Sequence, residues 1–191
     1  MWQREGLWDA RISLNASPDT IADPYLVERF LLMLNRSGLA AHQIVIELLE
    51  TTIIEGKDDM AAINIDHLAE CGIALELDDF GTGYASLSKL TQLPLSGLKL
   101  DRSLVSGLPD PAADSVVRAI LALASELQLN VVAEGIEEKE QALHLSGVGC
   151  RYGQGYGFGR PMPAKEFADW LKLNAYRPSP LVANVSHARR A

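Results

Sequence analysis

The chain has 191 residues, 48% of them hydrophobic and 22% charged, which is ordinary for one globular domain. Its net charge of −8 argues against a surface for a nucleic-acid polymer, because such a surface needs a basic stripe. Cys71 and Cys150 lie too far apart for a metal-binding spacing, so we expect reduced thiols. No apolar run approaches the ~18 residues of a membrane span, and the first residues do not resemble a signal peptide. We therefore expect a soluble, cytoplasmic protein.

Strand-like and helix-like patterns alternate along the chain. Short apolar stretches that end in a polar residue predict strands at 11–15, 44–50, 73–78, 98–101, 130–135 and 150–154. Apolar residues at helical spacing predict helices at 23–38, 58–70, 87–93, 115–127, 137–146 and 163–173. We expect residues 1–173 to form the domain. Residues 174–191 have no periodicity and are expected to be a disordered tail.

Strict alternation of strand and helix predicts βα units around a parallel sheet. A doubly wound sheet concentrates its site at one crevice, whereas a TIM-type barrel gathers residues from the C-terminal ends of many strands. Polar residues stand near the end of nearly every predicted strand, at Asn15, Glu47, Asp78/Asp79, Lys99, Glu134 and Gln154. We therefore predict an α/β fold, a TIM-type (β/α) barrel that is incomplete, with about six of the usual eight βα units.

Two adjacent carboxylates, Asp78 and Asp79, end the predicted strand 73–78 and precede a loop that contains Gly81 and Gly83. Carboxylate oxygens suit Mg²⁺, Mn²⁺ or Ca²⁺. Two such cations a few ångströms apart, sharing one Asp, form the arrangement used in two-metal phosphoester hydrolysis. The structural alternative is a solvated Asp pair before a turn, since Asp and Gly are ordinary turn residues.

The other candidates also have structural alternatives. Asn15 could cap the turn after its strand, and Lys99 could pair with a neighbouring glutamate. Glu134 could belong to the start of the next helix, and Gln154 could be a loop amide. Glu47 stands inside an apolar run, so if it is buried it must be paired or bound to a metal. Equivalent positions on successive strands favour one shared site.

The donor types narrow the chemistry of such a site. No Cys or His cluster is present and no histidine falls at a predicted strand end, which favours Mg²⁺ or Mn²⁺ over zinc. No Ser/His/Asp arrangement is evident. Attack of a metal-activated water on a phosphodiester is the chemistry that fits these residues.

Six segments together resemble the successive motifs of the EAL domain family: Ser13–Ser17, Glu47–Glu50, Asp78–Tyr84, Leu98–Asp101, Ala133–Glu137 and Gln154–Tyr156. The match runs in order from about residue 2 to residue 172. The resemblance implies a (β/α)₈ barrel that uses Mg²⁺ or Mn²⁺. It also implies hydrolysis of cyclic di-GMP to linear pGpG in bacterial second-messenger signalling.

The resemblance also assigns roles to residues. It makes four residues metal ligands, namely Asn15, Glu47, Asp78 and Asp79. It gives catalytic roles to Lys99, which would hold or polarise the attacking water, and to Glu134, which would bind or orient the water around the second metal.

Three further residues receive supporting roles by the same resemblance. Glu50 would belong to the catalytic residues by anchoring the loop after Asp79, and Gln154 and Glu137 would be cofactor-binding residues. The loop after Asp79 and the helix that follows it would form a homodimer surface.

The sequence departs from the family at its start. The Glu-Ala-Leu segment that names the family, and the arginine that follows it, are not in this chain. The resemblance thus begins after the family's first two strands, so that one ligand of the two-metal site is missing and the first and last predicted strands are open edges.

Three interpretations follow from this departure. The chain is the C-terminal part of a phosphodiesterase and is inactive or very weak alone. Alternatively, it is a degenerate module that binds cyclic di-GMP or a protein without hydrolysis. In the third interpretation, another chain supplies the missing units and restores activity.

Overall fold

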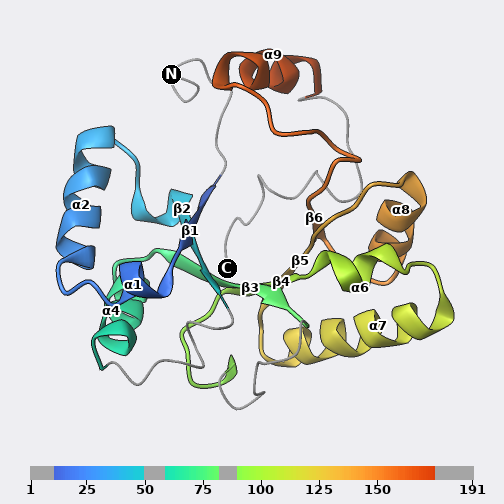
Figure 1. The fold of residues 1–191 in the computed structure, drawn as a ribbon, viewed down its shortest axis with the longest axis horizontal. Coiled ribbons are helices and arrows are strands. Elements are labelled where there is room, and N and C mark those ends of the chain that lie inside the picture. Colours follow the sequence, from blue (N-terminus) through green and yellow to red (C-terminus); the bar gives the residue numbers. More distant parts are fainter. Residues whose placement is uncertain (1–10, 50–58, 82–89, 175–191) are drawn as a thin grey trace.

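The computed structural model describes residues 11–49, 59–81 and 90–174 (Figure 1). Within these residues a parallel sheet of six strands contains β1 (Ile12–Ala16), β2 (Ile44–Leu49), β3 (Ala74–Phe80), β4 (Gly97–Leu100), β5 (Asn130–Ala133) and β6 (Tyr152–Gly153). The strands lie side by side in chain order. A doubly wound sheet would reverse its order at a switch point. The sheet is instead a half-barrel, which confirms the predicted incomplete barrel.

Helices connect the strands and flank the sheet. They are α1 (Pro18–Ile21), α2 (Leu26–Ser37), the 3₁₀-helix η2 (Ala41–Gln43), α4 (Asp59–Glu70), α6 (Arg102–Ser106), α7 (Pro111–Glu126), α8 (Lys139–Gly147) and α9 (Ala164–Asn174). Figure 1 shows α2 and α4 on the left of the sheet, α7 and α8 on the right, and α9 apart from them at the top. None of the helices in the described part of the chain is long and apolar enough to cross a membrane.

Capping residues explain where the helices differ from the prediction. The short helices α1 and α6 were not predicted, because four or five residues are too few to show a helical period. Each begins at a side-chain cap, Ser17 for α1 and Asp101 for α6. Helix α7 begins four residues earlier than the predicted start at 115, because Asp110 caps it and Pro111 opens it. Of the predicted helix 87–93, residues 87–89 lie outside the described residues, Leu90 is helical, and 91–93 form turns and a bend, so the predicted C-terminal end is wrong. Nearly all of the predicted tail also lies outside the described residues.

The two faces of the sheet have opposite character. Successive strand residues point to opposite faces, and on the outer face they form two hydrophobic clusters under the helices. One cluster joins β1, β2 and β3 to α1, α2 and α4, with Leu48 and Leu75 fully buried. The other joins β3, β4 and β5 to α6, α7 and α8, with Leu77 and Leu98 fully buried. The concave inner face carries the charged residues of the strands.

The outermost strands predict self-association. Within the described residues, β1 and β6 each pair with a single neighbour, and unpaired strand edges tend to pair with other chains. We expect the 191-residue chain to form oligomers or aggregates as its concentration rises, measured by light scattering. Leu14 on β1 is 37% exposed, and Leu14→Lys should reduce this association because an edge lysine opposes pairing. A wild-type chain that stays monomeric across the dilution series would contradict the expectation.

Candidate metal and catalytic site

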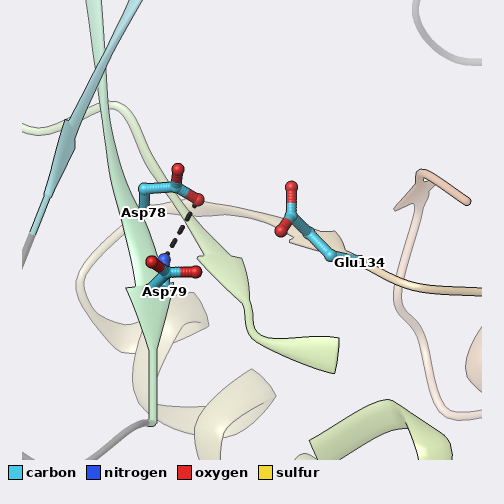
Figure 2. Close-up of side chains that lie close together, drawn as sticks. All are labelled: Asp78, Asp79 and Glu134. Atoms are coloured by element: carbon cyan, nitrogen blue, oxygen red, sulfur yellow. Dashed lines mark hydrogen bonds between the residues drawn. The ribbon is translucent and has the colours of Figure 1, made fainter. Parts of the chain in front are cut away.

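Three carboxylates converge where β3 and β5 end. Figure 2 shows Asp78 and Asp79 on β3 with Glu134, which directly follows β5, facing Asp78 across the gap. One oxygen from each of the three lies within 4.8 Å of the others. Such an all-oxygen group fits a hard divalent cation such as Mg²⁺ or Mn²⁺.

A local irregularity of β3 explains how adjacent residues reach the same place. Neighbouring residues of a regular strand point to opposite faces. Asp79, however, has a φ of 56°, in the left-handed region, and the register between β3 and β4 shifts between Leu77 and Phe80. The Asp79 backbone N–H donates to Asp78 Oδ1 at 3.0 Å, which fixes the turn (Figure 2). The strand thus brings both carboxylates toward Glu134.

Lys99 is the cationic centre of the site. Its Nζ lies 2.7 Å from Glu47 Oε2, 3.0 Å from Asp78 Oδ1 and 2.7 Å from Glu134 Oε1, and its side chain is 6% exposed. Burial alone would lower the pKa of Lys99, but the hydrogen bonds to Glu134 and Glu47 outweigh it and raise the pKa above the ordinary lysine value. Lys99 therefore stays protonated at neutral pH and acts as a cation, not as a base.

Negative charge exceeds positive charge around Lys99. Burial raises the pKa of Glu134 despite the opposing effect of Lys99, and burial together with the neighbouring Asp78 raises the pKa of Asp79. The charged form of each carboxyl is therefore disfavoured until further positive charge arrives. Divalent cations would supply that charge, as the donor set also indicates.

The remaining predicted residues lie around this centre or outside the described chain. Asn15 is exposed near the end of β1, in register with Glu47 on β2. Gln154 lines the cavity beneath the carboxylates, and Glu137 is exposed and pairs with Arg102 at 2.9 Å instead of joining the cluster. Glu50 and most of the predicted dimer loop fall outside the described residues. The roles assigned to these residues remain predictions.

The structure adds a buried carboxylate that the sequence analysis did not single out. Glu76 on β3 is 8% exposed and lies in register with Glu47. It lines a cavity of about 190 Å³ together with Lys99, Asn130 and other inner-face residues. Burial and the nearby Glu47 raise the pKa of Glu76. Like Glu47, it stands among apolar strand residues, and that pattern could have identified it.

Gly97 on β4 makes room for Glu76. A Cβ at position 97 would lie 2.9 Å from the Asn130 carbonyl oxygen and 3.3 Å from Glu76 Cγ. We expect Gly97→Ala to lower the free energy of unfolding by about 1–3 kcal/mol, since overpacking forces side chains and backbone to shift. Gly147→Ala is the matched control, because a Cβ there meets nothing within 4 Å. Equal urea midpoints for the two variants would show that the space above Gly97 is not tight.

Comparisons with known proteins agree with this geometry. The EAL domain family model matches residues 1–161. Cyclic di-GMP phosphodiesterase NbdA of Pseudomonas aeruginosa is 34% identical over 179 residues, which are 93% of this chain and 23% of that protein. The chain spans about a quarter of the length of the curated relatives it matches first.

Solved structures of similar fold include two that were determined with cyclic di-GMP. The MucR phosphodiesterase in complex with c-di-GMP has a TM-score of 0.79 and 36% identity, covering 87% of this chain and 67% of that one. BlrP1 of Klebsiella pneumoniae in a manganese and c-di-GMP complex has a TM-score of 0.77 and 31% identity, covering 84% of this chain and 41% of that one. The family match spans well over half of the sequence, and the chain belongs to the EAL domain family.

Proposed function

We propose that this chain carries the catalytic carboxylates of a phosphodiesterase that hydrolyses cyclic di-GMP to linear pGpG. The observation that carries the proposal is the group formed by Asp78, Asp79 and Glu134 beside the buried ammonium of Lys99. Relatives named as cyclic di-GMP phosphodiesterases support the substrate. A manganese and cyclic di-GMP complex of a structural relative supports the cofactor.

Each side chain has a definite task in this proposal. Asp78, Asp79 and Glu134 would hold divalent cations, with Glu47 and Asn15 completing the oxygen ligands. Bound Mg²⁺ or Mn²⁺ supplies a water of lowered pKa and neutralises charge on the phosphate. Lys99 offers a fixed positive charge to the attacking oxygen. In hydrolysis, a bond forms between the water oxygen and phosphorus, the bond from phosphorus to the 3′ oxygen breaks, and that oxygen takes up a proton.

Turnover of cyclic di-GMP is the direct test. The purified chain is incubated with the nucleotide and Mg²⁺ or Mn²⁺, and pGpG is followed by chromatography. We expect pGpG to form only with added cation, and not when a chelator is present. Bound nucleotide without pGpG would reject catalysis by this chain.

A second candidate function is binding without hydrolysis. It is favoured by the ion pairs of Lys99, whose ammonium already occupies two of the three carboxylates that would hold a cation. In that case the chain would bind cyclic di-GMP in the presence of Mg²⁺ or Mn²⁺ and leave it intact. Equilibrium dialysis of the same samples used for turnover separates the two functions. A chain that neither binds nor cleaves the nucleotide would contradict both.

A further inference from the structure

We propose that Glu76 is an alternative acceptor for the Lys99 ammonium, and that Lys99 turns to Glu76 when divalent cations bind Asp78 and Glu134. Glu76 is then a positioning residue for Lys99. By accepting the ammonium, Glu76 would make Asp78 and Glu134 available to the cations and so strengthen cation binding. This role rests on the proposed function, although the availability of Glu76 to Lys99 can be tested without any cation.

The path of the Lys99 side chain places it beside Glu76. Lys99 starts on β4, and its Nζ reaches Asp78 on β3 at 3.0 Å and Glu47 on β2 at 2.7 Å. The side chain therefore crosses the inner face of β3. Glu76 stands on the same face of β3, two residues before Asp78, and both Glu76 and Lys99 line the same cavity.

The packing leaves room for the carboxylate below Lys99. Glu76 is in register with Gly97, which is two residues before Lys99 on β4. Gly97 has no side chain, and Glu76 Cγ lies 3.3 Å from where its Cβ would be. Glu76 and Lys99 are thus diagonal neighbours on adjacent strands, a spacing that long side chains can bridge.

The Glu76 carboxylate is buried without an ion-pair partner among the described residues. It is 8% exposed, and among the described residues no hydrogen bond or ion pair to its carboxylate is observed. A buried carboxylate in this condition is costly. The adjacent Glu47 adds repulsion. Lys99 and Arg11 favour the charged form of Glu76, although neither forms an ion pair with it in the part of the chain that the structure describes. A cation that moves toward Glu76 would remove this cost.

Cation binding supplies the reason for Lys99 to move. Asp78 and Glu134 accept the Lys99 ammonium, and both belong to the carboxylate group that fits a divalent cation. A lone pair that binds a metal cannot also accept a hydrogen bond, and the positive charges repel one another. Glu47 is itself a proposed metal ligand, so Glu76 is the buried acceptor that remains outside the metal site. Glu76 would keep Lys99 charged and close to the reacting water.

The first experiment uses no metal. Asp78→Asn/Glu134→Gln removes the two charges that cation binding would neutralise, and Glu76→Gln is compared in this background and in the wild type with a chelator present. We expect Glu76→Gln to leave the urea midpoint of the wild type unchanged or raised, because a buried charge is removed. In the double variant it should lower the midpoint, because Lys99 then depends on Glu76. A change of the same sign in both backgrounds overturns the proposal.

The second experiment measures Mn²⁺ affinity, with free Mn²⁺ followed by electron paramagnetic resonance. We expect Glu76→Gln to weaken binding by about 10–100-fold, as for other residues that support metal ligands. Glu76→Asp, which keeps the charge, should recover part of the affinity. Asp114→Asn, on the outer helix α7, is the matched control and should change the affinity by less than about twofold.

A Lys99→Met background identifies how Glu76 acts. If Glu76 works through the ammonium, Glu76→Gln changes Mn²⁺ affinity by less than about twofold once Lys99 is absent. A persisting loss, or one Mn²⁺ fewer per chain, would make Glu76 a general charge or a ligand and would overturn the proposal. If Lys99→Met does not fold, the metal-free comparison decides. A wild-type chain that binds no Mn²⁺ would contradict the proposed function. The metal-free urea midpoints would still test whether Glu76 can accept the Lys99 ammonium.

Discussion

Asp78→Asn is expected to lower the rate of cyclic di-GMP hydrolysis about a thousandfold or more in any complete, active version of this barrel. A metal ion at such a site contributes several kcal/mol of transition-state stabilisation, and each 1.4 kcal/mol is about tenfold in rate. The asparagine keeps the size of the side chain but not the charge that binds the cation. Asp78 is 9% exposed and contacts Lys99, so the loss cannot be compensated by solvent. The rate of pGpG formation measures the effect.

The control for Asp78→Asn is Asp114→Asn. Asp114 lies on α7 and pairs with Arg118 at 2.7 Å and His144 at 2.6 Å, away from the inner face of the sheet. Its replacement should leave the rate unchanged. A folded Asp78→Asn variant with wild-type turnover would remove Asp78 from the metal site.

Lys99→Met is expected to lower the free energy of unfolding by about 3–5 kcal/mol, as for removal of one partner from a buried ion pair. Glu47, Asp78 and Glu134 would all lose their shared ammonium, and their side chains are only 8%, 13% and 19% exposed. Urea unfolding with a chelator present measures the loss. Added Mn²⁺ should restore part of it, because a ligand that binds the folded state stabilises it.

An exposed lysine provides the comparison for Lys99→Met. Lys139 begins α8 and is exposed, so Lys139→Met should change the stability by no more than about 0.5 kcal/mol. If the two variants unfold at the same urea concentration, the ion pairs of Lys99 contribute little to the fold.

The fold was predictable because each strand carries its polar residue at the same relative place. Glu47 and Lys99 interrupt apolar runs that must otherwise be buried, and the sheet places both on its inner face. The six predicted strands correspond to β1–β6, with ends that differ by one or two residues for most of them. Alternating strands and helices were enough to specify neighbours in chain order.

Other features depend on contacts that a sequence pattern does not display. Helices α1 and α6 begin at local caps and are too short to show a period. The left-handed backbone at Asp79 turns two adjacent side chains to one face, against the strand rule. Glu76 lies two residues before Asp78, inside β3, so a search for polar residues at strand ends does not find it. Its environment depends on Gly97, which is more than twenty positions away in the chain.

The charged site connects the two parts of the sheet that the hydrophobic clusters stabilise separately. Each cluster holds one part of the sheet, and they meet at β3. Lys99 belongs to the second part, yet its ammonium bonds Glu47 of the first, with Asp78 of the shared strand between them. The ion pairs therefore connect the two parts of the sheet across β3. Opening of either part exposes the same buried charges, so the chemistry of the site and the cooperativity of unfolding depend on one set of contacts.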